Sequence, residues 1–378
     1  MKKEIILVWS VILFVCFSCS KDDNIASASG SASNQDAKWR QEILTDLADN
    51  VILPNNQMLV NKTIDLKNAV ISFNDYPTLS RLTTVQNKWK EVQGQWELNC
   101  LFNLGPVRNQ YLFYAIDIWP TNHEFVDNII YGTDSINSAF INTKGSTVKG
   151  LPAIEDLIFN LTHGNQRVLD SLNNSVYSYR RKQYLSSLTQ NLLTQVNKID
   201  SIWSIDHGNY FEDFINHTQN EISGSFNVHL NNLIELLGYI ILTKIEKPMG
   251  VSVGMPMPDL SESLNSEHSL INIHQNIKTI EKSLIGENGS FKGINYLLDE
   301  IGAKKNGNLL SLTIEQKVDS VKLLINALSS NSIPAAVIDE PTEIDALLQQ
   351  VKDLYDLVRV DVADATSVIV TFSGNDGD

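Results

Sequence analysis

The chain has 378 residues, of which 43% are hydrophobic, 19% charged and 8% aromatic, with 10 Pro and 19 Gly. This apolar content excludes an intrinsically disordered or collagen-like chain, and the length predicts about two domains. The formal net charge of −15, from 29 Lys and Arg against 44 Asp and Glu, argues against binding nucleic acid or anionic lipid through a general basic field.

The N-terminus has the features of an export signal rather than of a folded element. Lys2 and Lys3 precede an apolar stretch that is too short for a typical membrane-spanning helix and that ends at Cys19. The pattern resembles a lipoprotein signal, in which residues 1–18 are cleaved and Cys19 is lipidated. An ordinary signal peptide cut elsewhere is the alternative. Residues 19–36 are rich in Ser, Ala, Gly and Asn, which predicts a flexible, lipidated tether.

The residues after Cys19 indicate a location. Lys21-Asp22-Asp23 resembles the acidic surface-export tag of outer-membrane lipoproteins in some Gram-negative bacteria. We therefore expect a lipoprotein held in the outer membrane by its lipid anchor, facing either the periplasm or the cell surface. Cys100 is then the one cysteine left unmodified, so neither an intramolecular disulfide nor a Cys-rich metal site is expected.

The body of the chain is predicted to be helical throughout. Apolar residues recur at spacings of three and four, whereas alternating patterns are nearly absent. Three of the stripes are Leu188, Leu192, Val196, Ile199 and Trp203; Phe226, Leu230, Leu233, Leu237 and Ile241; and Leu270, Ile273, Ile277, Ile280 and Leu284. We predict an all-α fold of two helical-bundle domains, residues 37–206 and 207–378, with the boundary placed to within about ten residues.

The familiar catalytic motifs are missing. The sequence has no His-Glu-x-x-His, G-x-S-x-G, Walker-type or G-x-G-x-x-G pattern, and its seven histidines are scattered. Composition and spacing alone therefore predict an anchored helical protein with no visible catalytic set.

Five segments carry a resemblance to a known family. They are Trp96-Glu97-x-x-x-x-Phe102-x-x-Gly105-Pro106, Ile116-Asp117-x-Trp119-Pro120, Gly150-x-Pro152-x-x-Glu155, Glu262-Ser263-x-x-Ser266, and Phe372-x-x-Asn375-Asp376-Gly377-Asp378. In this order they resemble the imelysin-like family (peptidase family M75). Its corresponding segments are W-E-x-x-E-x-F-x-F-G-P, I-D-x-W-P, G-x-H-x-x-E, E-S-x-x-S and F-x-x-N-D-G-D. The resemblance covers about residues 37–378.

The resemblance implies an all-helical fold of two bundle-like domains, a site in the cleft between them, an envelope location and an association with iron uptake. It also implies which residues line the cleft. The candidate ligand-binding residues are Glu97, Asp117, Gly150, Pro152, Glu155, Glu262 and Ser263. Alternatively, Glu97, Asp117 and Glu262 each cap a helix or pair with Arg108 or a lysine.

The chain departs from the family at two positions. Pro152 stands where the motif has its histidine, and Cys100 aligns with the second Glu of the first segment. Proline has no side-chain ligand atom, and Glu155 alone cannot hold and activate a metal-bound water, which takes about three protein ligands. We therefore expect no metallopeptidase activity from this motif, and only a weak metal site for a divalent metal or iron. Cys100 is either a soft ligand or a small buried hydrophobe.

Glu155 has two interpretations. It follows Pro152 near the predicted start of a helix, where the helix dipole stabilises a negative charge, so the carboxylate can stay ionised and meet a cation. Alternatively, it contributes roughly 0.5 kcal/mol to that helix and has no further role.

Three functional hypotheses remain open. The first is an envelope lipoprotein that binds an iron species, a haem-related molecule or a peptide in the cleft, in the service of iron or nutrient uptake. The second is a divergent metal-dependent peptidase whose ligands have moved to residues such as Cys100, His163 or Asp117. The third is an interaction scaffold for an outer-membrane transporter, which a cleft filled by its own side chains would favour.

Overall fold

The computed structural model describes residues 25–287 and 289–371. Internal contacts divide the chain into two units, Met1–Asp36 and Ala37–Asp378. Helix α1, Ile25–Leu47, begins inside the segment predicted as a tether. The predicted signal, the lipidation site Cys19 and the closing segment 372–378 lie outside the described residues. No helix in the described ranges is both long enough and apolar enough to cross a bilayer.

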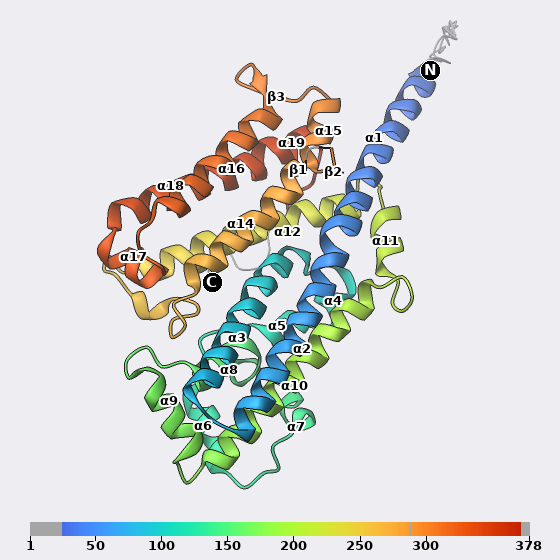
Figure 1. Ribbon diagram of the computed structural model, residues 1–378. Helices are drawn as coiled ribbons and strands as arrows, with labels where there is room; N and C mark the ends of the chain where they lie inside the picture. Colours follow the sequence, from blue (N-terminus) through green and yellow to red (C-terminus); the bar gives the residue numbers. More distant parts are fainter. Residues whose placement is uncertain (1–24, 288, 372–378) are drawn as a thin grey trace, which may run out of the picture. The chain divides into compact units, whose positions relative to one another are not determined.

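The first part of the second unit contains three long helices joined by short ones. Its elements after α1 are η1 (Ala48–Ile52), α2 (Leu53–Asp75), α3 (Leu79–Asn99), η2 (Cys100–Phe102), α4 (Gly105–Asn109), α5 (Leu112–Ile116), α6 (His123–Tyr131), α7 (Ser138–Asn142), η3 (Ser146–Val148), α8 (Gly150–Ile158), α9 (Gly164–Asn173), α10 (Ser178–Trp203) and α11 (Tyr210–Asn216). Helix α2 packs against both α3 and α10 (Figure 1).

The second part is also helical. Its elements are α12 (Ser225–Tyr239), η4 (Ile240–Glu246), α13 (Lys247–Met249), η5 (Pro258–Leu260), α14 (Ser269–Ile285), β1 (Gly286–Glu287), β2 (Phe291–Lys292), α15 (Ile294–Glu300), β3 (Lys304–Lys305), β4 (Asn308–Leu309), α16 (Leu310–Ala327), α17 (Ile333–Asp339), α18 (Pro341–Asp356), η6 (Leu357–Val362) and α19 (Ala363–Ala365). Strands β1 and β2, and strands β3 and β4, form two antiparallel pairs of two residues each. The predicted all-α class is confirmed.

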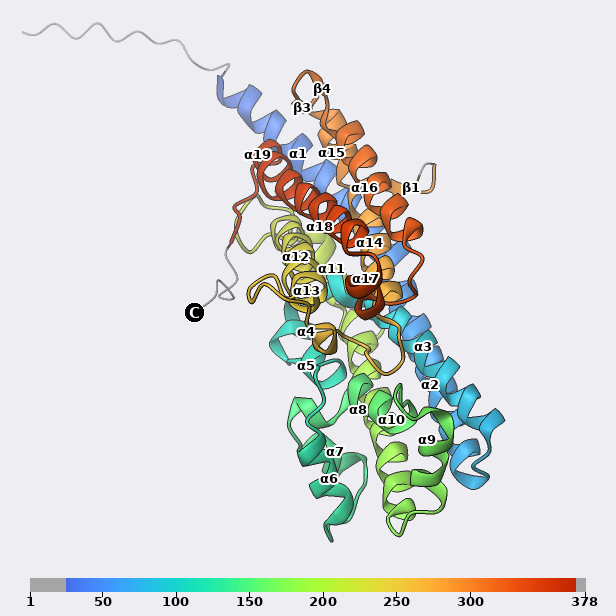
Figure 2. The same ribbon diagram turned by 90° about the vertical axis from the view of Figure 1, so that its left-hand side faces the viewer.

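The core is built from the apolar stripes that the sequence predicts. Every residue of the three stripes, on α10, on α12 with η4, and on α14, is buried. Burying one face of each helix against its neighbours is the main source of helical stability in a folded protein. Helix α14 packs against both α3 and α16, so it joins the two parts of the unit (Figures 1 and 2).

Candidate functional site

Three of the predicted candidate residues lie together. Glu97 is in the last turn of α3, Asp117 follows the end of α5, and Glu262 lies in the loop before α14. One ligand atom of each lies within 4.8 Å of the others. We call these three residues the carboxylate cluster. It is the one group of three or more metal-competent side chains found within residues 25–287 and 289–371.

Packing of α3 against α5 brings Glu97 close to Asp117. Trp96, buried on α3, meets the ring of Phe113 on α5 edge-on, with the ring centroids 4.4 Å apart. Gly150 then lets the start of α8 approach the end of α5. Its φ is +75°, and a Cβ at this position would overlap the carbonyl oxygen of Ile116. Gly150 therefore acts through the backbone, since only glycine meets both requirements without strain.

Lys244 supplies a buried positive charge to the carboxylate cluster. Its Nζ lies 2.8 Å from Oε2 of Glu97 and 2.9 Å from Oε2 of Glu262. The Lys244 side chain is 2% exposed, against 0% for Glu97 and 4% for Glu262. Three carboxylates facing one ammonium have a formal charge of −2 when all are ionised. That imbalance is costly in a buried site, so it favours either bound protons or a second cation.

A glutamine on α3 connects two members of the cluster. The buried Nε2 of Gln93 donates to Oε1 of Glu97 at 2.9 Å and to Oδ2 of Asp117 at 3.1 Å. Gln93 lies one helical turn before Glu97, a spacing that places both side chains on the same face of α3. The two carboxyl groups are thereby held in a defined relative position.

Two asparagines on α14 hold the other side of the cluster. Asn276 Nδ2 donates to the backbone oxygen of Glu97 at 2.9 Å and to its Oε2 at 2.8 Å. Asn272 Nδ2 donates to Oε2 of Glu262 and to Oγ of Ser263, both at 3.0 Å. The predicted candidate Ser263 thus touches the cluster through Asn272. Because α14 also packs on α16, these contacts attach the site to the second part of the unit.

Several oxygens at the site accept no hydrogen bond. The amide oxygens of Asn272 and Asn276 are buried and unpartnered. The second carboxyl oxygens, Oδ1 of Asp117 and Oε1 of Glu262, also accept none from the described part of the chain. The two amide oxygens are buried without a partner, which costs about 1–3 kcal/mol each. The arrangement therefore has spare oxygen donors of the kind that hard cations bind.

Burial and mutual repulsion alter the protonation of the cluster. Burial, with added repulsion from Glu262 and Glu97, raises the pKa of Asp117 well above its usual range. Burial and then Glu97 raise the pKa of Glu262 against the opposing effect of Lys244. Burial lowers the pKa of Lys244, but Glu262 and Glu97 outweigh it, so the net pKa lies well above the usual value. The lysine is therefore charged, while Asp117 and Glu262 bind protons more tightly than free carboxyls do.

Glu155 lies outside the group of three. Its Oε1 accepts the backbone N–H of Ser266 at 2.8 Å, so it anchors residues 261–268, which we call the site loop. Burial raises the pKa of Glu155 to about 7 although the bonds from Ser266 oppose this. A carboxylate at a helix start is expected to have a lowered pKa. Glu155 lies beyond the first turn of α8, where the helix dipole is too weak to offset the effect of burial. Pro152 is buried in that first turn.

Cys100, His163 and Asp117, the candidate ligands of a divergent peptidase, do not form a metal site together. The Cys100 thiol donates to Oε2 of Glu97 at 3.5 Å. Burial, followed by repulsion from Glu97, raises the pKa of Cys100 well above its usual value, which disfavours the thiolate form that binds metals. His163 is exposed at the start of α9 and is not part of the group of metal-competent side chains.

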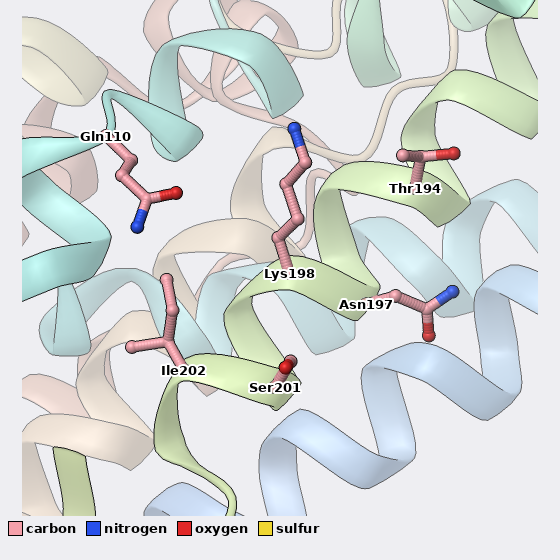
Figure 3. Close-up of a pocket in the computed structure, with 6 residues that line it drawn as sticks. All are labelled: Gln110, Thr194, Asn197, Lys198, Ser201 and Ile202. Atoms are coloured by element: carbon pink, nitrogen blue, oxygen red, sulfur yellow. The ribbon is translucent and has the colours of Figure 1, made fainter. Parts of the chain in front are cut away.

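A separate pocket lies along α10 and shares no residue with the cluster. It has a volume of about 400 Å³ and is lined by Gln110, Thr194, Asn197, Lys198, Ser201 and Ile202 (Figure 3). Thr194, Asn197 and Lys198 are exposed, so this is a shallow hollow on the outer face of the helix. It contains none of the candidate residues.

Comparison with known proteins now identifies the family. The family model of imelysin (peptidase M75) matches residues 52–360, which is most of the chain. The chain belongs to the imelysin family. The match includes all three members of the carboxylate cluster together with Lys244, so the site described above is part of the family domain.

Relatives of known structure agree in fold. An imelysin-like protein from Psychrobacter arcticum superposes with a TM-score of 0.72 at 16% identity, covering 89% of this chain and 98% of that one. A structure from Parabacteroides distasonis assigned as an iron-regulated protein A precursor has a TM-score of 0.72 at 18% identity, covering 87% and 95%. These likenesses show the imelysin fold.

A curated relative matches over a shorter stretch. Iron-regulated protein A from Synechococcus elongatus is 21% identical over 138 residues. The alignment covers 36% of this chain and 37% of that protein.

The resemblance to the imelysin family did not reveal the partners of the acidic residues. Lys244 continues the apolar stripe of α12 and η4, three residues after Ile241. A lysine at a core position is rarely buried without a partner. The position of Lys244 in this stripe therefore indicated a buried acidic partner. Asn272 and Asn276 likewise lie four residues apart beside the buried stripe of α14. Polar residues flanking a core stripe would have pointed to this network.

Proposed function

We propose that this member of the imelysin family binds a hard metal cation, an iron species foremost, at the carboxylate cluster. The observation that carries the proposal is that ligand atoms of Glu97, Asp117 and Glu262 lie within 4.8 Å of one another. Carboxylate oxygens at such separations can be bridged by one ion. The names of two relatives, both iron-regulated protein A, support iron as the cargo.

The donor set favours hard cations. The cluster offers carboxylate oxygens, with the unpartnered amide oxygens of Asn272 and Asn276 beside it. It offers no histidine, and the pKa of Cys100 is raised. Oxygen donors suit hard ions, whereas thiolate and imidazole ligands suit zinc and copper. We expect the hard trivalent ion Fe³⁺ to bind more tightly than divalent ions at this site.

Protons and the cation compete for the cluster. The pKa values of Asp117 and Glu262 are raised, so a cation that binds near neutral pH must release protons from these groups. Affinity therefore rises with pH until both carboxyls are ionised. A released proton is measurable by calorimetry in buffers of different ionisation enthalpy.

The test is metal-dependent stabilisation of the purified protein. An ion present at 100 times its dissociation constant raises the free energy of unfolding by about 2.7 kcal/mol. This increase should disappear in Asp117→Asn, which changes a half-buried residue with one hydrogen-bond partner. Glu235→Gln, an exposed acid paired with Arg108, is the control and should retain it. Stabilisation by no cation, or equal loss in both variants, would refute the proposal.

The location is proposed from the N-terminal pattern. Residues 1–18 and Cys19 support a lipoprotein of the outer membrane, placed to pass its cargo to an outer-membrane transporter. Labelling with a palmitate analogue should depend on Cys19 and be absent in Cys19→Ser. Labelling that persists in this variant would contradict the anchor.

A second candidate function is a scaffold whose site is sealed by its own side chain. The observation that favours it is the Lys244 ammonium, which already contacts Glu97 and Glu262. In this case no cation would bind even at high pH. The two candidates therefore make opposite predictions in the same metal titration.

A further inference from the structure

Lys244 occupies a position that a cation bound to the carboxylate cluster would need. Its Nζ contacts Oε2 of both Glu97 and Glu262 at 2.8 and 2.9 Å. We infer that Lys244 is a resident cation, which an incoming metal ion displaces, and that this lysine thereby sets the affinity of the site. The inference rests on the proposed function and adds the regulation of the same site.

One ammonium satisfies the cluster incompletely. Lys244 contacts two of the three carboxyl groups, and no ion pair with Asp117 is found in the described part of the chain. The second oxygens of Asp117 and Glu262 accept no hydrogen bond there either. An ammonium has three donors, whereas a metal ion takes six or more oxygen ligands. A metal ion can therefore engage oxygens that the lysine does not reach.

The position of Lys244 in the chain allows its side chain to move without the backbone. It lies in η4, a π-helical segment between α12 and α13, and such segments often occur at functional sites. Its neighbour Ile245 is fully buried and holds the segment against the core. The four-carbon stem of a lysine has several rotatable bonds. The ammonium can thus leave the cluster while η4 stays packed.

The Lys244 ammonium already lies near an aromatic ring on one side of the cluster. The ring centroid of Tyr239 is 5.7 Å from Nζ of Lys244, within the range of a cation–π contact. Tyr239 is 40% exposed, and Asp117 is half-buried, so these two residues mark a side of the cluster that solvent reaches. A displaced ammonium can move over the tyrosine ring toward water, where its charge is solvated.

The first experiment measures binding of Mn²⁺ alone to the wild type and to Lys244→Met. Removing the competing charge should tighten binding roughly tenfold or more, because two cations a few ångströms apart in a buried site repel strongly. Lys352→Met is the matched control, since Lys352 pairs with Glu246 of the same segment while being 38% exposed. Its affinity should equal that of the wild type.

A second measurement follows the lysine itself. In the metal-free protein, Lys244 should be protected from an amine-acylating reagent, since its side chain is 2% exposed. Adding Mn²⁺ should increase acylation of this residue severalfold in peptide mass spectra, without a change at Lys352. If Lys244→Met fails to fold without metal, Lys244→Gln, which keeps a hydrogen-bond donor for a carboxylate, takes its place with the same expected tightening.

The outcomes separate this inference from the proposed function. Equal or weaker Mn²⁺ binding by the folded Lys244 variant, or unchanged acylation on metal binding, would overturn the inference alone. Binding by neither protein would overturn the proposed function, and the inference with it. Tighter binding in the variant together with metal-induced acylation supports both.

Discussion

Glu262 and Glu155 are both buried carboxyls, one within the site loop and one that contacts it, yet their surroundings differ. Glu262 pairs with the Lys244 ammonium and lies among other acids. Glu155 accepts one backbone N–H, from Ser266, and has no cation within ion-pair distance in the described part of the chain. Glu155 belongs to the segment that resembles the family's G-x-H-x-x-E motif. The buried pairing of opposite charges, however, occurs at the carboxylate cluster. The carboxylate cluster therefore binds a positive charge, whereas Glu155 on α8 fixes the position of the site loop.

The largest expected change in the free energy of unfolding comes from removing the buried ion pairs of Lys244. Lys244→Met leaves the buried Glu97 and Glu262 without their cation, and breaking a buried pair in this way costs about 3–5 kcal/mol. Urea unfolding of the metal-free protein near neutral pH measures the loss. Because the acids can take up protons instead, the loss should shrink at lower pH. A change below about 1 kcal/mol at all pH values would show that the ion pair contributes little.

The next effect tests the start of α8. Gly150→Ala places a Cβ against the Ile116 carbonyl at a φ of +75°, so both strain and overlap should lower the free energy of unfolding by roughly 3–4 kcal/mol. Gly164→Ala is the matched control, since its φ is +68° but a Cβ there meets nothing within 4 Å. It should cost only about 1 kcal/mol. Equal losses in the two variants would rule out the close approach at Gly150.

A smaller effect concerns pH. The folded-state pKa of Glu155 is about 7, above its ordinary value of 4.5. The folded protein therefore holds this proton more tightly than the unfolded chain. The resulting stability is fully present below pH 4.5 and is lost as pH rises through 7. The contribution is on the order of 3 kcal/mol.

Glu155→Gln provides the check on this pH dependence. The amide oxygen of glutamine can still accept the Ser266 N–H, so stability at low pH should change little. The decline between pH 4.5 and 7 should become shallower in this variant, as followed by urea unfolding across that range. An unchanged slope would assign the decline to other groups, with Asp117 and Glu262 as the first to examine, because their pKa values are also raised.

The smallest effect compares two ion pairs from the same segment. Lys352 lies 2.6 Å from Glu246 of η4, but its side chain is 38% exposed, so solvent screens the pair. Lys352→Met should lower the free energy of unfolding by less than about 1 kcal/mol. A loss as large as that of Lys244→Met would contradict the distinction between the buried and the exposed pair.

Part of this organisation is predictable from local sequence. The stripe Leu270, Ile273, Ile277, Ile280 and Leu284 predicts α14 because a period of 3.6 residues puts these side chains on one face. The family resemblance also supplied Glu97, Asp117 and Glu262 as candidates, since its motifs carry them. It also named Glu155 as a member of the same site, whereas in the structure Glu155 accepts a hydrogen bond from the backbone of Ser266 and lies outside the cluster.

The amino-acid sequence by itself determined the helical class and the core stripes, because periodicity is a local property, while the acidic residues of the site came from the resemblance to the family. Only the tertiary structure decided that Lys244 pairs with Glu97 and Glu262, which lie 147 residues before it and 18 after it. It also decided that Asp117 has no ion-pair partner in the described part of the chain. Charge interactions depend on distance in space and on burial, and packing of α3, η4 and α14 sets both.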